Sequence, residues 1–93
     1  MSPRVDRRLL CLRRRVDPER EPEYRSLWTE LKERAESSGA HAWRFASPHD
    51  PAERLEFLEY EAGHDPRREA GAILAKLDNE VGPASVEEWL EDG

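Results

Sequence analysis

The chain has 93 residues and a formal net charge of −6, with 39% charged and 37% hydrophobic residues. This length fits one small domain, and the single cysteine excludes both an internal disulfide and a zinc site built from a cysteine cluster. The acidic balance argues against a nucleic-acid binder. With no apolar run of roughly 18 residues and no secretory leader, we expect a cytoplasmic protein without membrane contact.

The charge changes sign along the chain. The first twenty residues carry seven Arg against three acidic residues, a balance of +4, whereas the remainder has a balance of −10. An Arg-rich start can be a basic arm, but here the arginines are interleaved with the apolar residues of segment 5–16. We expect a strand that is buried on both faces, with Leu10 and Leu12 on one face and Leu9 and Cys11 on the other.

Residues 21–38 have the period of an amphipathic helix. The apolar positions recur three and four residues apart, at Tyr24, Leu27, Trp28, Leu31 and Ala35. Gly39 follows, at the place where a helix end favours a left-handed residue. The sequence therefore predicts that this helix ends at Gly39.

Two strands are predicted next, over 40–47 and 54–62. In the first strand, the large side chains of His41, Trp43 and Phe45 alternate with smaller or polar ones. A turn with two prolines separates the two segments, which indicates a hairpin.

A second helix is predicted from Pro66 to Val81, with Asp65 as its N-cap. The tail 84–93 fits either a strand or a short helix. The order of elements favours the strand, because it completes a ferredoxin-like βαββαβ domain over 1–93. This is an α+β fold with a four-stranded antiparallel sheet and two helices on one face. Its Arg-rich first strand would lie between two acidic strands, which stabilises the pairing.

The sheet face that the two helices leave uncovered is not polar for either parity of the strands. Exposed apolar sheet faces mark interfaces, so we expect a homodimer in which two sheets pack face to face.

The element order, the size and the aromatic second strand AHAWRF resemble the dimeric α+β barrel superfamily. This group includes small antibiotic-biosynthesis-monooxygenase-like proteins, and the resemblance extends from about Arg7 to Leu90. It implies a cleft between sheet and helices that holds a flat aromatic substrate or haem and is lined by Asn, Trp and His. The chain has Trp28, Trp43 and His64, but no Asn on its first strand.

The candidate site residues are chosen for their chemistry. For catalysis we select His41, because imidazole exchanges protons near neutral pH, and Tyr60, because its hydroxyl donates hydrogen bonds. For substrate binding we select three aromatic residues and one cation: Trp28, Trp43, Phe45 and Arg13. The alternative interpretation is that the aromatic rings form the core or an interface, and that Arg13 and Arg15 pair with acidic neighbours.

No cofactor and no metal are expected, since the histidines lack the spacing of a metal site and Cys11 reads as a buried thiol. The predicted function is a small dimeric protein that binds an aromatic or amphipathic molecule, with cofactor-independent monooxygenase-like activity. Two alternatives remain open, and whether the protein is an enzyme stays open with them. One is a non-catalytic dimerisation module; the other is a docking segment for a partner in the acidic tail 85–93.

Overall fold

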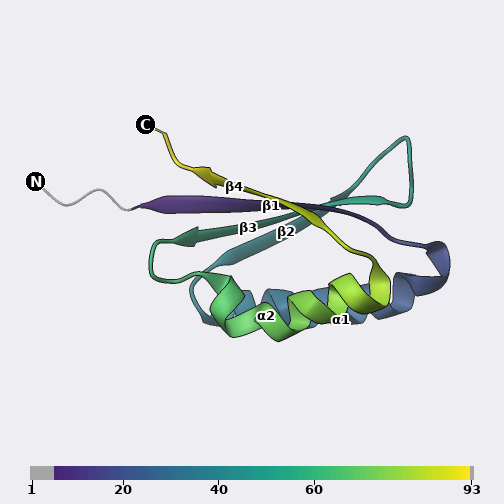
Figure 1. Ribbon diagram of the computed structural model, residues 1–93, viewed down its shortest axis with the longest axis horizontal. Coiled ribbons are helices and arrows are strands. Elements are labelled where there is room, and N and C mark those ends of the chain that lie inside the picture. The colour runs from purple at the N-terminus through teal and green to yellow at the C-terminus, as the bar shows by residue number, and fades with distance from the viewer. Residues whose placement is uncertain (1–5, 93) are drawn as a thin grey trace, which may run out of the picture.

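The computed structural model describes residues 6–92, which form two layers: a four-stranded antiparallel sheet and two helices packed on one of its faces (Figure 1). The elements are β1 (Arg7–Arg15), α1 (Glu21–Ser37), β2 (His41–Ala46), β3 (Glu53–Glu61), α2 (Pro66–Lys76) and β4 (Ser85–Leu90). The strand order β2-β3-β1-β4 places β1 between β3 and β4, as predicted, and confirms the ferredoxin-like α+β fold. Val5 and Gly93, the outer ends of the predicted first strand and tail, lie outside the described residues.

The tail forms a strand rather than a helix. β4 runs antiparallel to β1, with Val86 opposite Leu12 and Glu88 opposite Leu10. It covers the edge of β1 that would otherwise be unpaired, as the sequence predicts. All six β4 residues are exposed, so the strand is held mainly by its pairing with β1.

Helix α1 follows a short 3-10 turn, Pro18–Arg20, whose N-cap Asp17 accepts a hydrogen bond from the Glu19 backbone N–H. The helix buries one stripe, made of Tyr24, Trp28, Leu31 and Ala35. Gly39 follows with a φ of 94°, a left-handed conformation that glycine adopts without steric cost. The predicted limits of this helix are therefore confirmed.

Helix α2 begins as predicted, with Asp65 accepting a hydrogen bond from the Arg67 backbone N–H. It does not continue as one regular helix to Val81, because a π-helical turn, Leu77–Val81, replaces its last part. This turn ends at Gly82, where a Cβ would lie 2.5 Å from the Arg15 carbonyl oxygen. The wider turn thus brings the chain into close contact with the end of β1, and this approach requires glycine.

The two faces of the sheet differ in what covers them. Leu10, Leu12 and Leu58 point to the helices and are buried with the stripes of α1 and α2. On the opposite face, the row Trp43, Phe57 and Cys11 runs across three strands. The predicted apolar second face is thus confirmed.

Burial of β1 on both faces is not observed in the single chain. Leu9 and Cys11 are only half-buried, because nothing in the described residues covers the open face. Cys11 is therefore not the fully buried thiol that we predicted, although desolvation still raises the pKa of its thiol above the ordinary value.

Candidate functional site

A groove of about 550 Å3 lies between α1 and the edge strand β2. Three of the four predicted substrate-binding residues line it: Trp28, Trp43 and Phe45. Trp43 and Phe45 are 44% and 56% exposed, so their rings are accessible to a ligand. Trp28 is only 5% exposed and belongs mainly to the core, as the alternative interpretation has it.

Alternation along β2 separates these side chains. Trp43 and Phe45 lie on the open face of the sheet, whereas Arg44 points to the helix side. The Arg44 guanidinium carbon lies 5.1 Å from the centroid of the Tyr24 ring and 6.0 Å from that of the Trp28 ring. These are cation–π contacts, and they hold a half-buried positive charge against the wall of the groove.

Two aromatic pairs extend this surface onto the open face. His41 stacks on Trp43, with ring centroids 6.0 Å apart and an interplanar angle of 24°. Phe45 meets Phe57 edge to face, with centroids 5.7 Å apart. A flat ligand on Trp43 would therefore lie beside the His41 imidazole.

The two predicted catalytic residues, His41 and Tyr60, both line a second hollow of about 360 Å3. Their side chains belong to opposite faces of the sheet, because His41 pairs with Glu59 and Tyr60 is the next residue. Tyr60 is buried, and its hydroxyl donates a hydrogen bond of 2.8 Å to Glu88. Burial and this bond raise the pKa of Tyr60. Tyr60 is thus engaged inside the protein, whereas His41 is exposed.

The fourth predicted binding residue lies elsewhere. Arg13 lines a hollow of about 500 Å3 near Pro83 and Ser85, away from the aromatic groove. It donates a hydrogen bond of 2.6 Å to Glu53, and Arg15 pairs with Asp50 at 2.6 Å. In this structure both arginines have the acidic partners that the alternative interpretation expects.

Sequence reasoning missed a buried polar cluster between the sheet and α1. Arg14 and Glu56 are almost inaccessible, at 1% and 0% exposure. Arg14 donates to both Glu56 carboxylate oxygens, at 2.9 and 3.1 Å, and the Tyr24 hydroxyl donates to one of them at 2.7 Å. The π turn supplies further acceptors for Arg14: Asp78 at 3.0 Å and the Gly82 carbonyl at 2.6 Å. Burial, with Glu56 adjacent, raises the pKa of Tyr24 strongly.

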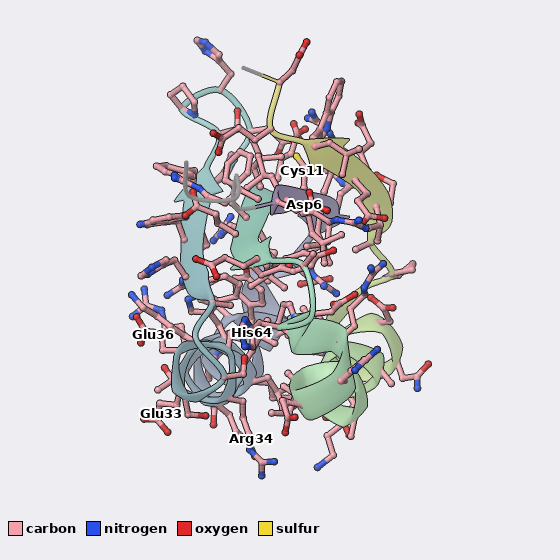
Figure 2. The ribbon with its side chains drawn as sticks, turned by 90° about the vertical axis from the view of Figure 1, so that its left-hand side faces the viewer. Asp6, Cys11, Glu33, Arg34, Glu36 and His64 are labelled. Atoms are coloured by element: carbon pink, nitrogen blue, oxygen red, sulfur yellow. The ribbon has the colours of Figure 1, made fainter. Side chains whose placement is uncertain are left out.

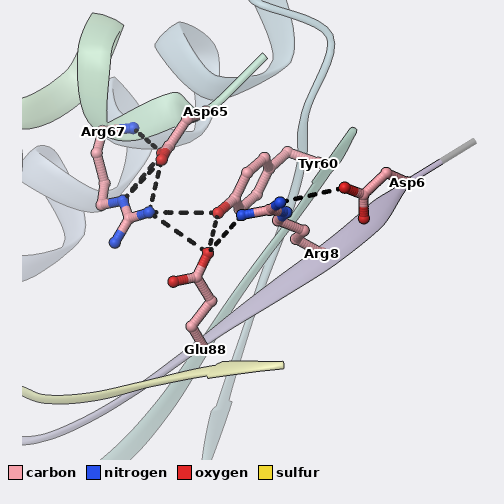
Figure 3. Close-up of polar contacts among 6 residues, drawn as sticks. All are labelled: Asp6, Arg8, Tyr60, Asp65, Arg67 and Glu88. Atoms are coloured by element: carbon pink, nitrogen blue, oxygen red, sulfur yellow. Dashed lines mark hydrogen bonds and ion pairs between the residues drawn. The ribbon is translucent and has the colours of Figure 1, made fainter. Parts of the chain in front are cut away.

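A second polar cluster joins β1, β3 and β4 to the start of α2 (Figure 3). Arg8 and Arg67 each have a guanidinium nitrogen 3.6 Å from the same Glu88 oxygen. Arg67 also pairs with the N-cap Asp65 at 2.6 Å and lowers the pKa of that carboxyl. The charge pairing predicted between the Arg-rich strand and the acidic last strand is therefore present.

The space between the sheet and the helices is occupied by the buried core, and the hollows described above open to solvent. The candidate site is therefore the groove at the sheet edge rather than the cleft between layers that the resemblance implies. No group of three metal-ligating side chains occurs in residues 6–92. None of the helices in this part of the chain is long and apolar enough to cross a bilayer.

Comparison with protein-family models gives no match for this sequence, and a search of curated proteins gives none either. Solved structures do match. A Bordetella bronchiseptica protein with the provisional name antibiotic biosynthesis monooxygenase aligns with a TM-score of 0.72 and 14% identity, over 95% of this chain and 99% of its own. A Nitrosomonas europaea protein with the same provisional name has a TM-score of 0.70 and 9% identity, over 100% and 95%.

A de novo designed protein also matches, with a TM-score of 0.60 and 14% identity, over 94% of this chain and 98% of its own. At such identities the likeness concerns the fold alone, since one fold serves many functions. These matches confirm the ferredoxin-like fold, and membership of the dimeric α+β barrel superfamily stays a prediction.

Proposed function

We propose that this chain binds a small flat aromatic molecule in the groove between α1 and β2. The observation that carries the proposal is the set of aromatic side chains, Trp28, Trp43 and Phe45, around a groove of about 550 Å3. This volume lies within the roughly 300–1,000 Å3 that is typical of small-molecule sites. Two exposed rings beside a fixed guanidinium offer a stacking surface and an orienting polar group.

We further propose that the bound molecule is the substrate of a cofactor-independent, monooxygenase-like reaction. The provisional names of two proteins with this fold support this step. In such a reaction an electron-rich substrate supplies the electrons itself: a CH2 group and O2 give a C=O group and one water. The protein has to hold the ring and remove a proton from carbon. His41, stacked on Trp43, is the candidate base.

The test of binding uses 2-naphthamide, a neutral flat probe, and isothermal titration calorimetry. We expect the Trp43→Ser variant to bind it about tenfold more weakly than the unchanged chain, because the stacking surface is lost. Equal affinities would contradict the assignment of the groove.

The test of activity uses anthrone as an oxidisable substrate and measures oxygen uptake. We expect His41→Ala to lower the rate about 100-fold or more while binding of 2-naphthamide is kept. If the chain binds 2-naphthamide but takes up no oxygen with anthrone, the monooxygenase-like reaction is rejected and only the proposal of ligand binding stands.

The open face of the sheet favours a second proposal, a homodimer that forms through this face. Trp89 is 57% exposed there and lies next to Leu9 across the strand pair. Burying such rings against a second copy removes apolar area from water. If dimerisation is the whole function, the protein is a non-catalytic module and the groove remains empty.

Two adjacent, similarly exposed residues of β4 provide a matched test of the dimer. Trp89 points to the open face, whereas Leu90 pairs with Arg8 and points to the helix side. We expect Trp89→Glu to raise the dimer Kd about tenfold or more in sedimentation equilibrium, and Leu90→Glu to leave it unchanged. A chain that sediments as a monomer before substitution would reject the dimer.

A further inference from the structure

We propose that the ligand of the α1–β2 groove is an aromatic acid, a flat ring with an anionic oxygen group such as a carboxylate, and that Arg44 binds this group. The inference rests on the proposed function and specifies the class of ligand.

Arg44 differs from the other arginines of the sheet in its lack of an acidic partner. The strands contain seven arginines, five in β1 and one each in β2 and β3. Six of them form ion pairs with Asp or Glu: Arg7, Arg8, Arg13, Arg14, Arg15 and Arg54. Within residues 6–92, no carboxylate oxygen lies within 4.0 Å of an Arg44 nitrogen.

The acidic residue that faces Arg44 across the strand pair, Glu56, is already engaged. Glu56 is opposite Arg44 in the register of β2 and β3. Both of its carboxylate oxygens accept hydrogen bonds from Arg14, and one also accepts the Tyr24 hydroxyl. Arg44 therefore contacts the Tyr24 ring rather than the Glu56 carboxylate.

The position of Arg44 suits recognition of an anion. Its guanidinium is held over Tyr24 and Trp28, so little side-chain freedom is lost when a ligand binds. A guanidinium presents five N–H donors in a planar fork that matches a carboxylate. Trp43 and Phe45 flank it along β2 and line the same groove, so one ligand can meet both the donors and a ring surface.

Other charges of the groove come from α1. Lys32 favours an anion, whereas the exposed Glu33 and Glu36 disfavour one near the helix. The anionic group is therefore placed on the β2 side, beside Arg44, with the ring along Trp43.

The experiment compares 2-naphthoate with 2-naphthamide, which differ in charge and share the ring, by isothermal titration calorimetry. We expect the unchanged chain to bind 2-naphthoate about tenfold more tightly, because its bonds with Arg44 are charge-assisted. Arg44→Met keeps a long side chain over Tyr24 without the charge. This variant is expected to lose the preference, so that its affinities for 2-naphthoate and 2-naphthamide become about equal.

Arg34→Met is the matched control. It removes the same charge from α1 at a position that lies outside the groove and points away from the sheet (Figure 2). This variant is expected to retain the preference for 2-naphthoate. Arg44→Lys, which keeps the charge, is expected to retain part of it.

The outcomes separate this inference from the proposed function. Equal affinity of the unchanged chain for the two probes, or a preference that survives in Arg44→Met, would overturn the assignment of Arg44 and leave ring binding intact. Failure of both probes to bind would overturn the proposed function, and this inference with it.

Discussion

The two faces of the sheet differ in two respects: one buries a pair of opposite charges, and the other exposes aromatic rings to solvent. The face that packs on α1 and α2 buries the Arg14–Glu56 pair completely, whereas the open face displays Trp43 and Trp89. Each of the three guanidinium nitrogens of Arg14 donates at least one hydrogen bond, and Glu56 balances its charge inside the chain. The exposed rings have no such cover in the described residues. Stability is therefore expected to depend on the first face, whereas the rings of the second face are free to stack on a ligand or on a second copy of the chain.

The largest expected effect is on the covered face. Glu56→Ala leaves Arg14 buried without its bidentate partner, and we expect a loss of about 3–5 kcal/mol in the free energy of unfolding. Guanidinium denaturation followed by circular dichroism measures it. Glu53→Ala, which breaks the exposed pair with Arg13, serves as the control and should cost clearly less. Equal losses would remove the distinction between buried and exposed pairs.

The second effect is a loss of stability in alkali that comes from the same face. Burial raises the pKa of Tyr24 and Tyr60 above the ordinary value of 10.0. Below pH 10 both the folded and the unfolded chain keep these protons. Above it the unfolded chain loses them first, so the free energy of unfolding falls by up to about 1.4 kcal/mol per pH unit for each tyrosine.

Unfolding midpoints between pH 8 and pH 11.5 test this dependence. Tyr24→Phe has no proton to lose and is expected to flatten the alkaline decline. A decline of the same slope in Tyr24→Phe would assign the effect to other groups.

The smallest expected effect is on the open face. Trp43→Ser removes a ring that is 44% exposed, and we expect the free energy of unfolding to change by about 0.5 kcal/mol or less. Denaturation at two protein concentrations separates this change from any effect on association. A large loss at both concentrations would mean that the ring stabilises the fold, and the contrast between the faces would fail.

Much of the fold could be predicted because local signals and the global order agree. The periodicity of α1, the N-cap Asp65 and the left-handed Gly39 are local features that the structure retains. The place of β1 between two acidic strands followed from the ferredoxin-like order of the elements and agreed with the charges, and the Arg8–Glu88 contact reflects it.

What the sequence did not reveal depends on contacts between distant residues. Arginines are normally exposed, and the burial of Arg14 depends on its pairing with Glu56, which is 42 residues away in the sequence. The sequence does not show that these two residues meet. One signal for its burial was available: Arg14 alternates with Leu10 and Leu12 along β1, so its side chain lies on the same face as theirs. The arrangement of the candidate residues could not be predicted from the sequence, because one step along a strand moves a side chain to the other face. Such a step places His41 and Tyr60 on opposite faces of the sheet.

The buried arginine also has a consequence for how the chain finds its fold. A β1 strand that slipped by two residues along β3 would still bury leucines on the correct face, so hydrophobicity alone tolerates such errors. In one direction the slip would take Arg14 away from Glu56, and in either direction it would shift Arg14 relative to its acceptors in the π turn. An unmatched charge in the core is costly, so misaligned sheets are disfavoured. The hydrogen bonds of Arg14 thus favour the observed alignment of β1 with β3 over shifted alignments.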